Sequence, residues 1–174
     1  WNPKWAEHYR LLTESYADPE EGIKRHLQAY LACVSFVDEQ IGKVIQALDA
    51  SSFKDNTIVV LASDHGYHQG EKQYLYKNSL WEESTRIPLI IRLPGMEQSY
   101  GKSVTHPVSL VDIYPTIADL CGLADKDNRL NEKGTTLDGY SLKPFLIDPD
   151  TQEWQGPDVA LSVVQTPGPG RTSA

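Results

Sequence analysis

The sequence contains little cysteine and no long apolar run. Its 174 residues include two cysteines, Cys33 and Cys121. Two cysteines are too few for a disulfide scaffold, and their spacing matches neither a zinc site nor a CxxC redox motif. Both lie among apolar residues, which favours small buried side chains over reactive thiols. No apolar run approaches the ~20 residues that a membrane helix requires, so no membrane span is expected.

Positive charge is also scarce, and it is not clustered. The chain carries 16 Lys and Arg against 24 Asp and Glu, a formal net charge of −8. Without a basic patch, this pattern argues against a nucleic-acid partner. Hydrophobic residues at 40% and charged residues at 23% are typical of a globular domain. The chain begins without a methionine or a signal peptide, so we expect it to be a piece of a longer protein.

A long helix is predicted from Asp18 onward. Asp18 is an N-cap candidate, and the proline and two glutamates that follow it suit a first helical turn. Apolar residues then recur in steps of three and four and form one stripe as far as Leu48. Residues 1–19 show no such period, and we interpret them as loop with a short helix at most.

Two continuous apolar runs, 57–62 and 88–93, are rich in β-branched residues. Runs without polar alternation are typical of strands that are buried on both faces, as in a parallel sheet covered by helices. A long helix followed by two such strands indicates α/β architecture.

Less regular elements are predicted in the last third of the chain. A capped helix is expected at 110–120, with Pro115 in its first turn and Gly122 after its end. We interpret 124–140 as polar loop, 141–146 as a helical turn and 159–164 as a strand.

The segment between the two predicted strands carries the candidate chemistry. Asp64 and His65 directly follow the first strand, which is where open α/β sheets bind ligands. Gly66 allows a sharp turn, so both side chains could face one crevice. The alternative is a turn in which Asp64 caps a following helix, and spacing alone does not separate the two.

Two further residues of this segment are weaker candidates. His68 completes a His-x-x-His pair with His65, but no third ligand follows at a zinc spacing, so a partly exposed loop histidine is favoured. Lys77 lies in an uncharged stretch and could neutralise an anionic oxygen, although a solvated surface lysine is the commoner arrangement.

Several segments together resemble the sulfatase family, in the branch that contains iduronate-2-sulfatase and choline sulfatases. The resemblance covers about residues 25–147 and is carried by the order and spacing of these motifs: Phe36–Gly42, Asp55–Val60, Ser63–Glu71, Lys77, Trp81–Ile91, Pro107–Thr116 and Leu137–Leu142.

The resemblance implies an alkaline-phosphatase-like α/β fold with a parallel-rich sheet covered by helices, present here as a partial domain. It divides the chain into the carboxyl-terminal part of a catalytic domain, 1–147, and a smaller subdomain or tail, 148–174. It implies hydrolysis of a sulfate ester of a small molecule or glycan with a divalent cation, usually calcium, in a periplasmic or secreted protein.

The resemblance also assigns roles to the candidate residues. Asp64 and His65 inherit the metal-ligand role, although calcium prefers oxygen, and His65 could instead contact the sulfate or the nucleophile. Lys77 inherits the sulfate contact. Lys72 stands where family members often have histidine, which leaves the substrate preference open.

The family's nucleophile motif is absent from this sequence. Sulfatases attack with a hydrated formylglycine, release the alcohol and then eliminate sulfate. The formylglycine is made from Cys or Ser in a Cys/Ser-x-Pro/Ala-x-Arg motif, and no cysteine or serine here begins one. We therefore expect the nucleophile to lie in a missing amino-terminal part, without which the chain is inactive. The alternatives are a phosphate or phosphonate ester hydrolase of the same superfamily and a non-catalytic module that binds anionic glycans.

Overall fold

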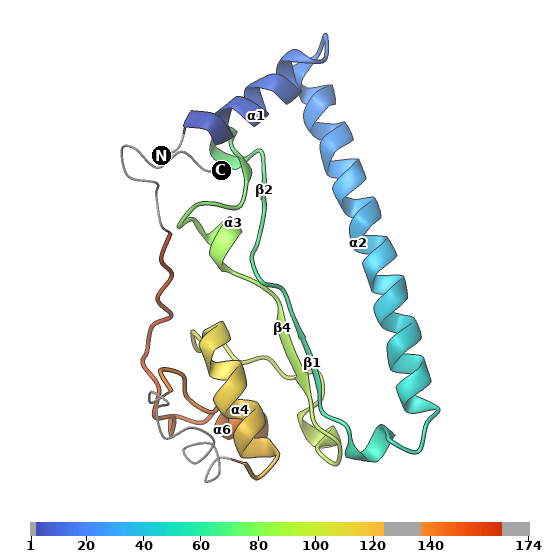
Figure 1. Cartoon of the computed structure of the whole chain (residues 1–174), viewed down its shortest axis with the longest axis vertical. Coiled ribbons are helices and arrows are strands. Elements are labelled where there is room, and N and C mark those ends of the chain that lie inside the picture. Colours follow the sequence, from blue (N-terminus) through green and yellow to red (C-terminus); the bar gives the residue numbers. More distant parts are fainter. Residues whose placement is uncertain (1–2, 124–136, 165–174) are drawn as a thin grey trace. The chain divides into compact units, whose positions relative to one another are not determined.

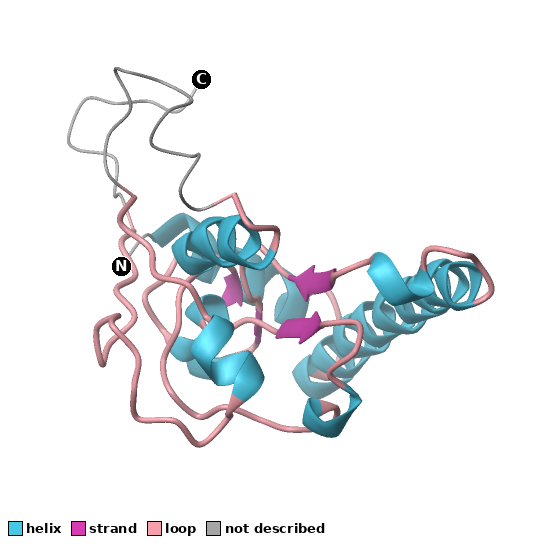
Figure 2. Cartoon of the chain, turned by 90° about the horizontal axis from the view of Figure 1, so that it is seen from below, coloured by secondary structure: helices cyan, strands magenta, loops and turns pink. Residues whose placement is uncertain are grey.

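The computed structural model describes residues 3–123 and 137–164. Helices and loops make up most of this part of the chain, and the strands are short (Figures 1 and 2). In chain order its helices and strands are α1 (Pro3–Glu14), α2 (Pro19–Asp49), β1 (Val59–Ala62), β2 (His68–Gln69), β3 (Leu75–Tyr76), α3 (Glu82–Thr85), β4 (Leu89–Arg92), α4 (Ile113–Leu120) and α6 (Lys143–Ile147).

The chain forms two compact units. Among the described residues, the first comprises 3–57, 61–90 and 162–164, and the second comprises 58–60, 91–123 and 137–161. The division into a catalytic-domain part, 1–147, and a subdomain or tail, 148–174, came from family resemblance rather than from contacts, and it stays a prediction.

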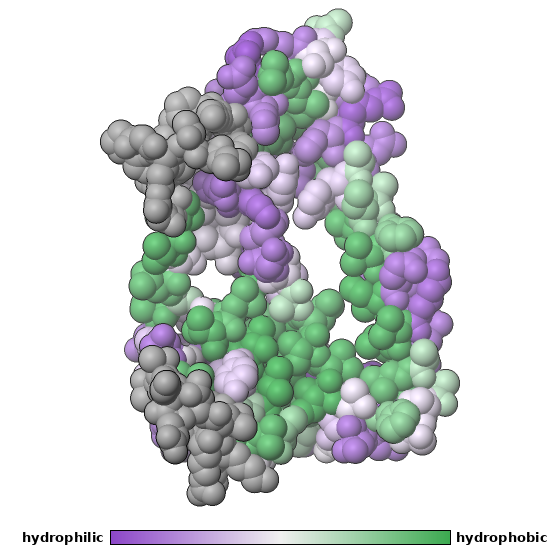
Figure 3. All heavy atoms as spheres, viewed as in Figure 1, coloured by the Kyte–Doolittle hydropathy of each residue, from purple (hydrophilic) through white to green (hydrophobic). Residues whose placement is uncertain are grey.

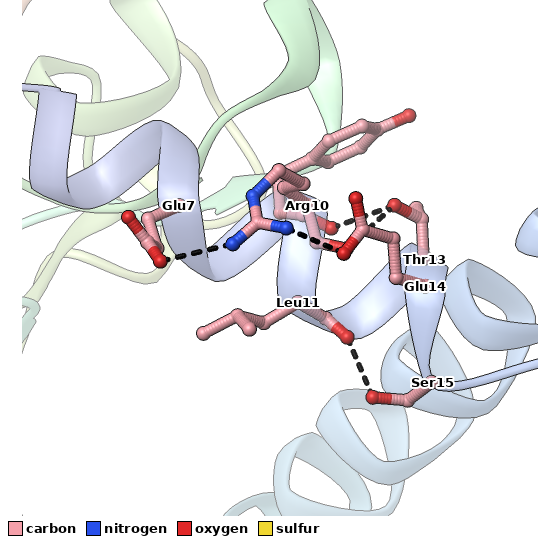
Figure 4. A network of polar contacts seen from close by, with 7 residues as sticks. Glu7, Arg10, Leu11, Thr13, Glu14 and Ser15 are labelled. Atoms are coloured by element: carbon pink, nitrogen blue, oxygen red, sulfur yellow. Dashed lines mark hydrogen bonds and ion pairs between the residues drawn. The ribbon is translucent and has the colours of Figure 1, made fainter.

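Helix α1 is longer than the short helix that the sequence suggested. It runs over 12 residues and packs against α2 and β3, and contacts along its own surface add to its stability. Arg10 pairs with Glu7, at 3.0 Å, and with Glu14, and the Ser15 hydroxyl donates to the carbonyl of Leu11 (Figure 4). These contacts join residues three or four positions apart, which are neighbours on a helix surface, so they add modestly to the stability that packing provides.

Helix α2 begins where the sequence predicted it. The Asp18 side chain accepts a hydrogen bond from the Glu20 amide at 3.0 Å, and the helix runs for 31 residues. Its apolar stripe, however, remains exposed over much of its length, with Val44 68% exposed. Figure 3 shows these apolar residues along one side of α2 and polar residues along the other.

Strands β1 and β4 pair in a two-stranded sheet, as the two apolar runs suggested. The prediction that both strands are buried on both faces is wrong for this chain, since neither contains a buried residue and Ile90 is 58% exposed. Both cysteines, predicted to be buried, are exposed as well. A β-branched or apolar run indicates that a segment suits a buried position, but it becomes buried only if other residues pack against it.

The second unit is organised by Asp112, which is buried at the start of the predicted 110–120 helix. Its carboxylate accepts the Ser109 amide at 2.7 Å and the Tyr140 amide at 2.8 Å. One turn further on, the Thr116 hydroxyl accepts the Leu142 amide at 2.8 Å. These bonds connect the start of α4 to the segment that leads into α6.

The remaining sequence predictions have mixed outcomes. The helical turn predicted at 141–146 corresponds to α6. The strand predicted at 159–164 is wrong, because that segment forms no ladder with any described residue. Of the predicted polar loop, 124–136 lies outside the described residues. No helix in the described part of the chain is both long and apolar enough to span a membrane.

Candidate active site

Asp64 and His65 lie directly after β1, as the sequence predicted. The residues that follow form a loop leading to β2, with no helix before Glu71. Asp64 therefore does not cap a helix, and the alternative interpretation of this turn is wrong. The Asp64 side chain is 84% exposed and the His65 side chain is 33% exposed.

Lys77 follows β3 and reaches the same place. Its Nζ lies 2.6 Å from Nε2 of His65, and that nitrogen lies 3.5 Å from Oδ2 of Asp64. The structure thus brings together the three residues that the sequence analysis selected. A lysine that meets a histidine 12 positions away is not the solvated surface side chain of the alternative interpretation.

The hydrogen bonds determine which His65 nitrogen carries the proton. Nδ1 lies 2.8 Å from the carbonyl oxygen of Gly66, which can only accept, so Nδ1 donates. In the neutral ring Nε2 then has a free lone pair, and it accepts from the Lys77 ammonium group. The ring is held by its own backbone on one side and by Lys77 on the other.

Gly66 is required by close packing of two loops. Its amide donates to the Ser84 carbonyl at 2.8 Å, and a Cβ at this position would lie 2.1 Å from the Glu83 carbonyl oxygen. No side chain fits at such a separation. The glycine therefore lets the Asp64–His65 loop lie directly against α3.

The backbone is strained between this loop and Lys77. Lys72, Gln73 and Tyr76 have φ values of 55°, 56° and 132°. Each is a conformation that non-glycine residues rarely adopt, at a cost of ~1–3 kcal/mol. Strain of this kind is concentrated at functional sites, where the surrounding contacts maintain it.

Comparison with known proteins identifies the family. The sequence model of the sulfatase family matches residues 2–123. The chain belongs to the sulfatase family. It is 49% identical over 100 residues to a sulfatase of Formosa agariphila, covering 58% of this chain and 19% of that protein. It is 37% identical over 127 residues to the choline-sulfatase of Rhizobium meliloti, covering 73% of this chain and 23% of that protein. The chain thus spans about a quarter or less of these sulfatases.

Solved structures show the same relationship. One is a protein in complex with its substrate D-glucosamine-2-N,6-O-disulfate, with a TM-score of 0.66, 32% identity and coverage of 79% of this chain and 26% of that chain. Another is the phosphonate monoester hydrolase of Silicibacter pomeroyi, also with a TM-score of 0.66 and 32% identity, covering 78% and 25%. These similarities confirm the predicted alkaline-phosphatase-like fold, of which this chain forms a part.

The donor set at this sulfatase loop fits part of a divalent-cation site. The exposed Asp64 carboxylate is the hard oxygen ligand that calcium prefers. His65 Nε2 already accepts from Lys77, so a cation could bind this nitrogen only if Lys77 moved away. Within residues 3–123 and 137–164, no group of three or more His, Cys, Asp or Glu side chains is arranged around a common point. Further ligands would have to come from elsewhere.

His68 differs most from its prediction. The sequence favoured a partly exposed loop histidine, but the side chain is completely buried, at 0% exposure. Its ring packs edge-on against Tyr74, with centroids 4.9 Å apart, and Trp81, 5.2 Å apart. Burial lowers the pKa of His68 below its usual value. No local sequence pattern relates His68 to Tyr74 and Trp81, so its burial had no signal in the sequence.

Lys72 and Glu83, which also lie near this loop, pair with each other. Lys72 Nζ lies 3.2 Å from Oε1 of Glu83 and 4.9 Å from the Trp81 ring centre. A hydrogen bond to the Glu83 backbone, and then Lys72, lower the pKa of the Glu83 carboxyl. A separate hollow of about 330 Å³ is lined by Ala6, Tyr9, Arg10, Thr13 and Gln73, none of them a predicted site residue.

Proposed function

We propose that the protein is a sulfuric ester hydrolase in which Asp64, His65 and Lys77 form one wall of the active site. The observation that carries the proposal is the 2.6 Å contact between Lys77 Nζ and His65 Nε2, beside Asp64, in a chain of the sulfatase family. The contact supports the proposal because the Lys77 amine and the His65 ring lie together after β1, and open α/β sheets bind ligands at such strand ends.

Lys77 supplies positive charge to the sulfate group. As the ester bond to sulfur breaks, negative charge grows on oxygen, and a fixed ammonium group stabilises that charge more strongly than it stabilises the substrate. His65 orients Lys77 through Nε2, while its own ring is fixed by the bond from Nδ1 to Gly66.

Asp64 is proposed as a ligand of a divalent cation, calcium by family resemblance. A bound cation would neutralise charge on the sulfate oxygens. The exposed carboxylate supports this role because it can turn toward an ion without losing a buried contact. The role of His65 as a second ligand stays a prediction, since the structure gives Nε2 to Lys77.

The nucleophile is proposed to be a formylglycine in the missing amino-terminal part of the same protein. None of the 174 residues begins a Cys/Ser-x-Pro/Ala-x-Arg motif, and the chain covers 19% and 23% of the two sulfatases above. Whether the precursor is Cys or Ser stays open. The substrate is proposed to be a sulfated small molecule or glycan, and the protein to be periplasmic or secreted.

A panel of chromogenic esters tests the reaction class. The natural-length protein is assayed with p-nitrophenyl sulfate and with the p-nitrophenyl ester of phenylphosphonate, each in calcium and after chelation. We expect higher kcat/KM for the sulfate, and loss of turnover on chelation that added calcium reverses.

Two other results would replace the proposal. Preference for the phosphonate would assign the protein to the class of the Silicibacter pomeroyi enzyme, whose fold it shares equally well. Absence of turnover with both esters, together with tight binding of sulfated oligosaccharides, would indicate a non-catalytic glycan-binding module.

A further inference from the structure

The buried side chain of His68 belongs to a part-buried hydrogen-bond network that meets at the Ser79 hydroxyl. Its Nε2 lies 2.8 Å from the Ser79 hydroxyl, which lies 2.9 Å from the Ser84 hydroxyl. The same Ser79 oxygen accepts the Trp81 amide at 3.2 Å. His68 and Ser84 are both buried, so the loss of one partner would leave a polar group unsatisfied away from water.

The bond directions determine the state of His68. Ser79 has one hydrogen, and it donates that hydrogen to Ser84. The Ser79 oxygen then accepts from Nε2 of His68, and the other tautomer would leave a buried N–H at Nδ1 without a partner among the described residues. Nδ1 is buried with no hydrogen-bond partner among the described residues, which disfavours a second proton on the ring.

This network is connected to Lys77 from both directions along the chain. On the amino-terminal side, His68 pairs with Tyr76 in the β2–β3 ladder. On the carboxyl-terminal side, the Ser79 that His68 contacts donates its amide to the Lys77 carbonyl at 2.9 Å. The segment that carries Lys77 is thus held at both ends by one buried residue.

We propose that His68 is a positioning residue that holds Lys77 against His65 through its hydrogen bond to Ser79. Lys77 has a long flexible side chain on a strained backbone, and misplacement by ~1 Å costs an active site up to about 100-fold in rate. The kinetic part of this inference rests on the proposed function, whereas its structural part concerns the Lys77–His65 contact alone.

Two variants of matched size separate positioning from packing. In His68→Gln the side-chain amide can still donate to Ser79, whereas His68→Met fills the space without a donor. In the natural-length protein, we expect His68→Met to lower kcat toward p-nitrophenyl sulfate by up to about 100-fold, with a smaller change in KM. His68→Gln should recover most of the loss. Equal kcat in wild type and His68→Met would overturn the proposal.

The ¹⁵N signals of the His65 ring give a readout that does not need turnover. In wild type Nε2 should show the shift of a neutral nitrogen that accepts a hydrogen bond, and in His68→Met it should move toward a free nitrogen. If the wild type shows no sulfatase activity but this shift still depends on His68, the proposed function fails while the positioning role stands. An unchanged signal in His68→Met contradicts the positioning role whatever the activity.

Ser79, the partner of His68 in this hydrogen bond, provides a second and independent pair of variants. Ser79→Ala removes the acceptor, whereas Ser79→Thr keeps the hydroxyl. If the His68 variants fail to fold, the same displacement of the His65 signal is expected in Ser79→Ala and not in Ser79→Thr. Identical signals in these two variants would overturn the inference.

Discussion

His65 has one free lone pair and two candidate uses for it. In the structure, Nε2 accepts from Lys77 at 2.6 Å, while Nδ1 is engaged by Gly66. A metal ion and a lysine cannot occupy the same lone pair. The two roles therefore predict different consequences when the ring is replaced.

Substitution of His65 separates these roles. In His65→Gln the side-chain oxygen can still accept from Lys77, so we expect this variant to retain more sulfatase activity than His65→Ala. Calcium affinity, measured by titration calorimetry on the natural-length protein, should change little in either variant but fall strongly in Asp64→Ala. A large loss of calcium affinity in both His65 variants would instead establish His65 as a ligand.

The positions of the candidate site residues along the chain were predictable from the sequence, but the packing that surrounds them was not. The adjacency of Asp64 and His65 after a strand was visible in the sequence, and family resemblance added Lys77. The burial of His68 was missed because an isolated histidine in a polar loop does not reveal that Tyr74 and Trp81 pack around it. Such packing depends on residues that a local pattern does not relate to one another.

At the scale of elements, local signals succeeded where a cap or period exists. The boundaries of α2 followed from Asp18 and the apolar stripe, and the 110–120 helix from its capping residues. Helix α1 was underestimated because its partly buried face is short, with Ala6, Tyr9 and Leu12 in steps of three, and the segment also carries many polar residues. The apolar segment 159–164 forms no ladder among the described residues, since a strand requires a partner as well as suitable side chains.

One contact next to helix α6 makes stability depend on pH. Lys143 donates to Asp119 at 2.9 Å and Ser141 donates at 2.8 Å, and these two bonds lower the pKa of the Asp119 carboxyl below its usual value. A lowered pKa in the folded state adds stability above the unfolded pKa of ~3.9, and this stability is lost as the pH falls through the folded pKa.

We therefore expect Asp119→Asn to lower the free energy of unfolding at pH 7 by no more than about 1 kcal/mol, because the pair is partly exposed. The difference in the free energy of unfolding between Asp119→Asn and wild type should shrink below about pH 4. Urea unfolding of both proteins at pH 7 and pH 3 measures this difference. Asp138→Asn is the control, since Asp138 is an exposed carboxylate of the same unit and its removal should leave stability unchanged. A difference that persists unchanged at pH 3 would show that the carboxylate charge is not responsible.

At the scale of the whole molecule, the chain exposes apolar surface that its composition does not require. Much of the α2 stripe and Ile90 of β4 are exposed, although their sequences suit covered positions. The matched sulfatases are four to five times longer than the part aligned with this chain. We attribute the uncovered surface to the absence of residues that correspond to the rest of those proteins.

The 174 residues alone should therefore behave differently from the natural-length protein. We expect the isolated chain to bind a hydrophobic dye and to self-associate, because exposed apolar patches of this kind favour association, and to show no turnover of p-nitrophenyl sulfate in calcium. Light scattering and the chromogenic assay measure the two properties. A monodisperse 174-residue chain would contradict the explanation given for the exposed apolar surface. Turnover by that chain would contradict the proposal that the nucleophile lies outside these residues.

The central claim is that Lys77, held against His65, acts on the sulfate group. The most direct measurement is kcat/KM of the natural-length protein toward p-nitrophenyl sulfate for Lys77→Met, with Lys102→Met, an exposed loop lysine, as the matched control. Loss of a charge that stabilises the transition state predicts a fall of ~100-fold or more for Lys77→Met and wild-type activity for Lys102→Met. Wild-type activity in a folded Lys77→Met protein would contradict the claim.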